Sequence, residues 1–468
     1  MSTFPLELTD EIIAWIPVVW DGAWYAQRER HRTLLDCSLV CSAWLPASRH
    51  QLFQKLYIDT PERYDLLVSR VLHSEKMRIH LLSVRSVVLF TDRPRAALPT
   101  FHRRPFLLEF AGHLPNLTSM DFRGSVEAFS YHTSSFLAIS RFSTTRTLMI
   151  MNCTFPSFGT LRRTLTLLPS LDSLQISNSS WPDPAVDRLP VLSHGASTVR
   201  RPVLLLLNIL GWEADPPSRR CAQQFIAWLS ETAASSSLVD LRVSGHSSVA
   251  QIGSMAMFGP SLFRFGRGVR KLDIEVHQAD TELEMFLCKL TSLETLHLRF
   301  KYALQPDTWV QAETLVRSLP RPTQLVNLYI SASSYDHGPL ELSKFEGLEA
   351  LDQALRLELF RGLQAVKLHV EYRKEEGDPE EGPALTATML AVMKNKSPQL
   401  VARNIIEVSA EVYYMHHADR TPTASTREVG LSRPLVHTHT KTKTADSLDH
   451  LEQELRALYG YAPCRTSG

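Results

Sequence analysis

A short apolar pattern recurs along most of the chain and restricts the folds that the chain can adopt. The pattern is apolar-x-x-apolar-x-apolar, as in "GVRKLDIEV" (268–276) and "LTSLETLHLRF" (290–300). Side chains alternate along a strand, so the last two apolar residues of each copy lie on one face. The central apolar positions lie mostly 24 to 38 residues apart, and they are Val87, Met120, Leu148, Leu174, Leu241, Leu272, Leu296, Leu328 and Val366.

One interval in this series is about twice as long as the others. It runs from Leu174 to Leu241, and it predicts one further repeat around "PVLLLLNI" (202–209). Near the end of the pattern, "RNIIEVSAEVYYM" (403–415) is expected to form a last strand. The repeat therefore extends over most of the chain.

Segments with helical periodicity lie between these strands, at 221–233, 281–290, 308–319 and 348–360. A strand with a return helix cannot bury its apolar face alone, so such units stack into a solenoid. A doubly wound α/β sheet also alternates strands and helices. The absence of a Gly-rich phosphate loop after any strand favours an irregular leucine-rich-repeat solenoid of short parallel strands and helices, which is an α/β fold.

The N-terminal region has a different, helical pattern. We expect a first helix from an N-cap at Thr9 to Pro17, a loop over 17–32 and a second helix over 33–44. A third short segment starts at Pro46. A further helix follows, with Thr60 as its N-cap and Pro61 at its first position.

Composition and charge exclude several classes of protein. Apolar residues make up 44% of the chain, and the formal net charge is +1, so the totals indicate neither a nucleic-acid partner nor a membrane surface. The longest apolar run, 202–212, is shorter than a membrane span. The six scattered cysteines predict reduced, buried thiols and an intracellular protein, cytoplasmic, nuclear or both.

No catalytic motif supports an enzyme, and we expect no cofactor and no metal. Cys37 and Cys41 lie four residues apart, which suits two metal ligands, but no second pair follows, and buried thiols are favoured. The His416–His417 pair and the "HTH" at 437–439 are interpreted as chance. The acidic stretch 371–382 is predicted to be a solvated loop. The basic stretch 93–105 is predicted to be an inter-repeat loop, with an acidic partner as the alternative.

The first 58 residues resemble an F-box. Pro5, Leu6, Glu7 and Leu8 resemble its opening, "SLVCSAW" (38–44) its core and Phe53 its closing aromatic residue. The resemblance, to F-box proteins of mushroom-forming fungi, implies a three-helix bundle that docks on a Skp-type adaptor of a cullin–RING ubiquitin ligase. The repeats would then bind the protein to be ubiquitinated. The implied adaptor-binding residues are Pro5, Leu6, Leu8, Ile12, Ile13, Leu34, Leu35 and Val40, and the implied structural anchors are Ile16, Leu39, Trp44 and Phe53.

The predicted domains are an F-box-like helical domain (1–60), the solenoid (61–415), a flexible tail (416–446) and a C-terminal helix (447–460). An alternative function is that of an interaction scaffold outside any ligase. In that case the helical bundle only caps the end of the solenoid, since solenoids need such caps.

Overall fold

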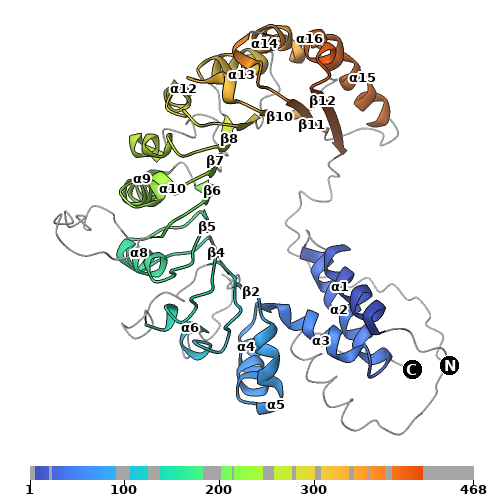
Figure 1. The fold of residues 1–468 in the computed structure, drawn as a ribbon, viewed down its shortest axis with the longest axis vertical. Helices are drawn as coiled ribbons and strands as arrows, with labels where there is room; N and C mark the ends of the chain where they lie inside the picture. The colour runs from blue at the N-terminus through green and yellow to red at the C-terminus, as the bar shows by residue number, and fades with distance from the viewer. Residues whose placement is uncertain are drawn as a thin grey trace, which may run out of the picture. The chain divides into compact units, whose positions relative to one another are not determined.

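A computed structural model of the chain shows a mixed α/β protein with parallel strands (Figure 1). It forms two compact units; the described residues up to Leu171 belong to the first and those from Asp172 to the second. The structure describes residues 6–19, 24–90, 106–124, 137–182, 202–212, 215–245, 258–276, 281–300, 307–336, 342–356, 358–374 and 382–414.

Among its described residues, the first unit contains three N-terminal helices followed by four strands with short helices between them. The N-terminal helices are α1 (Leu6–Val19), α2 (Trp24–Val40) and α3 (Leu45–Gln54). The elements that follow are β1 (Lys55–Ile58), α4 (Pro61–Leu66), the π-helix η1 (Leu67–Leu72), α5 (Glu75–Arg78), the 3-10 helix η2 (Ile79–Ser83), β2 (Ser86–Phe90), α6 (Phe106–Glu109), β3 (Ser119–Arg123), β4 (Thr147–Met151) and α8 (Phe158–Thr166).

The second unit continues the alternation of strand and helix. Its strands are β5 (Ser173–Ser177), β6 (Leu206–Trp212), β7 (Asp240–Gly245), β8 (Lys271–Val276), β9 (Thr295–Phe300), β10 (Asn327–Asp336), β11 (Ala365–Lys374) and β12 (Ile406–Tyr414). Its helices are α9 (Pro216–Ser230), α10 (Ala234–Ser237), η5 (Pro260–Phe265), α12 (Thr281–Leu287), α13 (Asp307–Arg317), η6 (Pro322–Gln324), η7 (Leu342–Phe345), α14 (Leu348–Leu355), η8 (Glu358–Phe360), α15 (Gly382–Asn395) and α16 (Pro398–Ala402).

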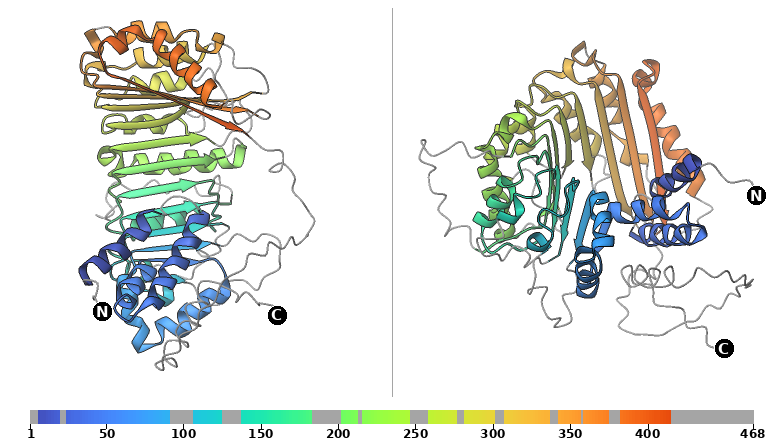
Figure 2. Two further views of the ribbon diagram at one scale, coloured as in Figure 1. Left: turned by 90° about the vertical axis from the view of Figure 1, so that its right-hand side faces the viewer. Right: turned by 60° about the horizontal axis from the view of Figure 1, so that its bottom comes forward.

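The strand register confirms the predicted repeat. In each unit every strand pairs in parallel with the next strand in sequence (Figure 2). The predicted central residues are direct partners: Val87 pairs with Met120, and Leu241 with Leu272. The extra repeat also exists, since Leu207 of β6 pairs with both Leu174 and Leu241.

Two rows of apolar side chains form the core of the second unit. Leu241 and Val243, two residues apart on β7, are both fully buried, and the same spacing recurs on its neighbours. The sheet of this unit is curved, with its strands on the inner side and its helices on the outer face (Figure 1). Burial of apolar side chains between the sheet and these helices stabilises the fold by roughly 25 cal/mol per Å² of apolar surface. The opposite face of the sheet carries polar residues.

The N-terminal helices differ from the prediction at several boundaries. The first helix starts at Leu6, so Thr9 is buried inside it rather than at its N-cap, and it continues past Pro17 to Val19. A proline within a helix removes one backbone hydrogen bond, which is a cost but not an absolute stop. The predicted loop 17–32 is also wrong in its second half, because α2 begins at Trp24. The three helices contact one another, and α3 also contacts β1.

The start of α4 was predicted correctly. The Thr60 side chain accepts a hydrogen bond from the backbone N–H of Arg63, and Pro61 occupies the first turn. A proline at this place loses no helical hydrogen bond, since that N–H has no partner in any helix. The end of β1 and the start of α4 are thus fixed by local sequence.

Other predictions were wrong or fall outside the described residues. The acidic stretch 371–382 begins inside a strand, because β11 extends to Lys374 and buries Tyr372. Cys153 and Cys221 are buried as predicted, whereas Cys37 is half-buried and Cys41 and Cys288 are exposed. The predicted tail 416–446, the helix 447–460, the basic stretch 93–105 and the histidines at 416, 417, 437 and 439 lie outside the described residues.

Candidate interaction surfaces

The first helix carries apolar side chains on two sides. Thr9 and Ile13 are buried, while Leu8, Ile12 and Trp15 expose 46%, 43% and 58% of their surface. The exposed residues are spaced i, i+4 and i+7, which places them on one face of the helix. We call this set the α1 outer face. A stripe of large apolar side chains in water is a feature of docking surfaces.

The implied adaptor-binding residues divide into two groups in the structure. Leu8, Ile12 and Val40 are exposed and therefore available to a partner. Ile13, Leu34 and Leu35 are buried, which corrects their assignment from a contact surface to the core of the helices. They hold α1 and α2 in place because apolar side chains gain free energy on leaving water. Leu6 is in α1, with its side chain outside the described residues, as is the whole of Pro5.

The implied anchors also divide. Phe53 is buried and stacks on His80, with ring centroids 5.1 Å apart, as expected of an anchor. Ile16 and Trp44 are half-buried. Leu39, at the end of α2, is exposed beside Val40, so its assignment as an anchor is corrected. The C-terminal turn of α2 consequently presents a second pair of apolar side chains to solvent.

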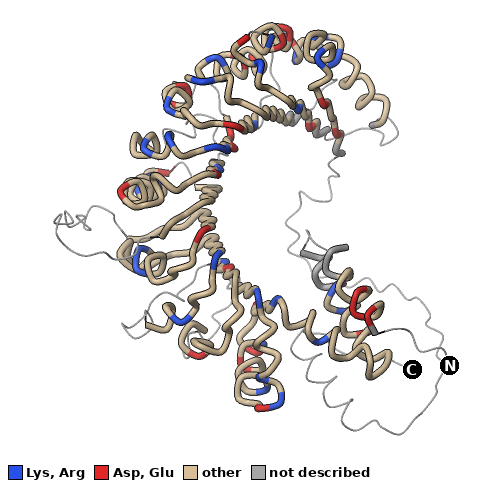
Figure 3. The backbone as a smooth tube through the Cα atoms, in the orientation of Figure 1, with Lys and Arg blue, Asp and Glu red and all other residues tan. Residues whose placement is uncertain are grey.

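A row of polar side chains crosses the sheet of the second unit on the face opposite its helices. On β5 to β11 these side chains occupy the position between two buried apolar residues, and on β12 the two flanking apolar residues are half-buried. Both signs of charge occur on the strands (Figure 3). Direct strand partners form the row, and we call it the polar row: Gln175, Asn208, Arg242, Asp273, His297, Tyr329, Lys367 and Glu407.

Asp273 is the centre of one cluster in this row. Its Oδ1 accepts a hydrogen bond from Nε of Arg299 at 2.6 Å and lies 3.5 Å from Nδ1 of His297. Partial burial acts to raise the pKa of Asp273, but the hydrogen bond from His297 and the charge of Arg299 outweigh it, and the pKa lies below its usual value. The carboxylate is therefore ionised at neutral pH and holds two neighbouring side chains in place.

A second cluster lies further along the row. The Lys367 ammonium is 2.5 Å from the carboxylate of Glu407 and 5.8 Å from the ring centroid of Tyr329. The hydrogen bond to Glu407 raises the pKa of Lys367. The Tyr329 ring also meets the His297 ring edge-on, with 5.9 Å between centroids. The part of the polar row from Asp273 to Glu407 is thus a connected surface of paired groups, which suits contact with a protein better than binding of a free ion.

The described residues contain no group of three or more His, Cys, Asp or Glu side chains that could hold a metal ion. None of their helices has the length and apolar character required to cross a membrane.

Sequence reasoning missed two parts of these surfaces. Trp15 follows Leu8 and Ile12 at helical spacing, so the periodicity of the first helix was sufficient to find it. The polar row occupies the variable position inside each repeat, as in Leu241-Arg242-Val243 and Leu296-His297-Leu298. In a strand, this position faces away from the two apolar residues beside it, so the repeat alignment was sufficient to find the row.

Comparisons with known proteins add little to this picture. No protein-family model matches the chain, and no curated protein matches it. Among solved structures, the chain is similar to one described as a crystal structure of a TLR13–ssRNA13 complex, with 13% sequence identity and a TM-score of 0.29. The match covers 64% of this chain and 41% of that chain. A likeness of this extent carries no argument about function.

Proposed function

We propose that this protein is a substrate-recognition subunit of a cullin–RING ubiquitin ligase. In this proposal the N-terminal helices dock on a Skp-type adaptor, and the repeats bind the protein to be ubiquitinated. The α1 outer face is the observation that carries the proposal, because it presents Leu8, Ile12 and Trp15 within the segment that resembles an F-box. The proposal assigns no catalytic step, metal or cofactor to this chain.

The chemistry of the α1 outer face suits such an adaptor. An amphipathic helix commonly docks through anchors at i, i+4 and i+7, and a large aromatic anchor such as Trp15 contributes strongly when a partner buries it. The three residues belong to a helix whose opposite side is held by buried Ile13. The surface is therefore preformed on a helix, which lowers the entropic cost of binding.

The repeats supply the second half of the proposed function. The polar row offers charged, hydrogen-bonding and aromatic groups on successive parallel strands, and solenoids bind proteins through such extended faces. Ion pairs hold Asp273 to Arg299 and Lys367 to Glu407. A partner of this surface therefore meets groups that are already positioned.

Co-purification of the full chain with a Skp-type adaptor tests adaptor docking. We expect Leu8→Asp with Ile12→Asp to reduce recovery of the adaptor about tenfold or more, because both anchors would carry a charge into the interface. Ile79→Asp with Leu137→Asp is the matched control, since both residues are exposed and lie outside α1. Unchanged recovery with the α1 double variant, in a chain with native circular dichroism, would reject the proposal.

A specific contact favours one alternative function. Helix α3 leads directly into β1, the first strand of the sheet, and contacts it, which supports a role for the N-terminal helices as a cap on the repeats. In a scaffold outside any ligase this would be their whole role. The same co-purification separates the two, because a capping role predicts that the wild-type chain recovers no adaptor.

A further inference from the structure

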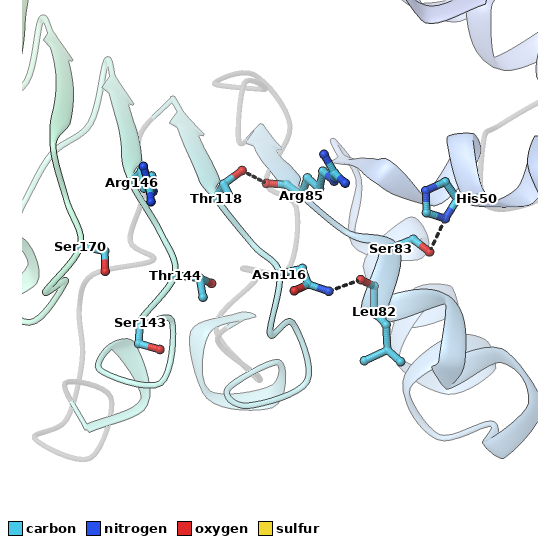
Figure 4. Close-up of a pocket in the computed structure, with 10 residues that line it drawn as sticks. All are labelled: His50, Leu82, Ser83, Arg85, Asn116, Thr118, Ser143, Thr144, Arg146 and Ser170. Atoms are coloured by element: carbon cyan, nitrogen blue, oxygen red, sulfur yellow. Dashed lines mark hydrogen bonds between the residues drawn. The ribbon is translucent and has the colours of Figure 1, made fainter. Parts of the chain in front are cut away.

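A polar hollow lies in the first unit, where its strands begin. It has a volume of about 560 Å³ and is lined by residues from α3, from η2 and from the turns before β2, β3, β4 and β5 (Figure 4). The lining residues are His50, Leu82, Ser83, Arg85, Asn116, Thr118, Ser143, Thr144, Arg146 and Ser170. None of them is an acid, and two are arginines.

The two arginines are fixed at a defined spacing by the backbone. The N–H of Thr118 donates to the carbonyl of Arg85, and the N–H of Arg146 donates to the carbonyl of Thr118, each at 2.9 Å. Arg85 and Arg146 thus stand two strand positions apart, with Thr118 between them. At about 4.8 Å per strand, their backbones are separated by roughly 10 Å.

Both guanidinium groups are available to a ligand. Arg85 and Arg146 are exposed, and neither has an ion-pair partner among the described residues. Arginines on strands elsewhere behave differently, since Arg123 is paired with Asp121 and Arg299 with Asp273. A guanidinium presents five N–H donors in a planar fork that matches a carboxylate. The hollow therefore has two unsatisfied anion-binding groups.

The remaining polar groups of the hollow favour a peptide over a simple anion. The Thr118 and Thr144 hydroxyls donate to backbone carbonyls at 3.1 and 2.9 Å, and the Asn116 amide N–H donates to the carbonyl of Leu82 at 2.8 Å. With those hydrogens used, the oxygen atoms of the three side chains remain as acceptors. An extended peptide carries backbone N–H groups that such acceptors bind, whereas a free anion has no donor for them.

We propose that this hollow binds an extended acidic segment of a partner protein. In an extended segment with polyproline II geometry, which has three residues per turn and rises about 3.1 Å per residue, two carboxylates three residues apart lie on the same side and about 9 Å from each other, close to the spacing of Arg85 and Arg146. The backbone N–H groups between the carboxylates face the side-chain oxygens of Thr118 and Asn116. Single-stranded nucleic acid fits less well, because none of the lining residues is Phe, Tyr or Trp, the side chains on which bases commonly stack.

The proposal extends the proposed function by naming the chemistry of one bound segment, and it does not depend on adaptor docking. Its test uses the purified full chain without any adaptor. A negative result for peptide binding therefore does not count against adaptor docking, and a negative result for adaptor docking does not count against peptide binding. The probe is a fluorescent twelve-residue peptide with Glu at every third position, and its comparison peptide has Gln at the same positions. Fluorescence anisotropy should show about tenfold tighter binding of the Glu peptide, and this difference should shrink as salt is added.

Charge-reversal variants locate the site. Arg85→Glu with Arg146→Glu should remove the preference for the Glu peptide, whereas Arg78→Glu with Arg141→Glu, two exposed arginines of the same unit outside the hollow, should keep it. Arg85→Lys with Arg146→Lys should weaken binding several-fold, since lysine cannot bind a carboxylate through two donors. Circular dichroism checks that each variant is folded.

Three results would overturn the proposal. The first is equal affinity for the Glu and Gln peptides. The second is an equal loss in the two charge-reversal variants, which would indicate attraction to the net charge alone. The third is tighter binding of a twelve-nucleotide oligouridylate than of the Glu peptide, which would assign the hollow to nucleic acid.

Discussion

The carboxylate of Asp352 accepts a hydrogen bond from the backbone N–H of Leu400 at 2.9 Å, across 48 residues of sequence. Its other oxygen accepts from the N–H of Gln399 at 3.1 Å. Asp352 is buried in α14, and the two N–H groups belong to the first turn of α16, where a helix has no internal partners for them. One side chain therefore joins two helices of successive repeats.

Removing this carboxylate should destabilise the second unit. We expect Asp352→Ala to lower the free energy of unfolding by about 1–3 kcal/mol, because two N–H groups at the start of α16, one of them that of buried Leu400, lose their acceptor. Asp352→Asn should cost less, since its remaining oxygen still accepts one bond. Denaturant unfolding measures both. The control is Glu349→Ala on the same helix, whose exposed ion pair with Lys396 should contribute less than about 1 kcal/mol. Equal effects of the two alanine variants would contradict this account.

The core rows of the sheet give a second prediction. Leu241 is fully buried between direct strand partners Leu207 and Leu272. We expect Leu241→Ala to lower the free energy of unfolding by about 2–5 kcal/mol, through lost burial and the cavity that remains. Leu359→Ala makes the same chemical change at an exposed site and should stay within about 0.5 kcal/mol. Comparable denaturation midpoints for the two variants would show that the row is not the core.

The sheet was predictable because its signal is local and repeated. Each strand carries two apolar residues two positions apart, and stacking the copies in order aligns those residues without any long-range information. Leu296 and Leu328 were therefore placed correctly as direct partners. The hidden repeat at Leu207 followed from the length of the interval alone.

The candidate surfaces were less predictable, since exposure depends on which neighbours a residue meets. Leu35 and Leu39 lie one helical turn apart on α2, yet the first is buried and the second exposed. The start of α2 was predicted wrongly because the segment 25–32 is mostly polar. It lacks the apolar periodicity of a helix and was therefore predicted to be a loop. That segment is helical, and its His31 is buried against Tyr57 of β1. Such a contact cannot be inferred from local pattern.

The burial of His31 makes the first unit sensitive to acid. Its ring lies edge-on to Tyr57, with 5.6 Å between centroids. Burial, together with the nearby charges of Arg30, Arg63 and Lys55, lowers the pKa of His31 from 6.5 to about 3. The unfolded chain therefore binds a proton at a higher pH than the folded chain, so stability is retained above pH 6.5 and is lost as the pH falls from 6.5 towards 3.

At pH 5 this difference corresponds to about 2 kcal/mol of lost stability for His31 alone. The pKa of His80 is lowered as well, by burial and by the charges of Arg49 and His50, so it adds to the loss in the same direction. We expect the thermal midpoint of the first unit to fall between pH 7.5 and pH 5, and His31→Gln to reduce that fall because glutamine does not titrate. His73→Gln, at an exposed site, should leave the fall unchanged. The same pH dependence in His31→Gln as in the wild type would show that the buried imidazole does not control the stability of this region.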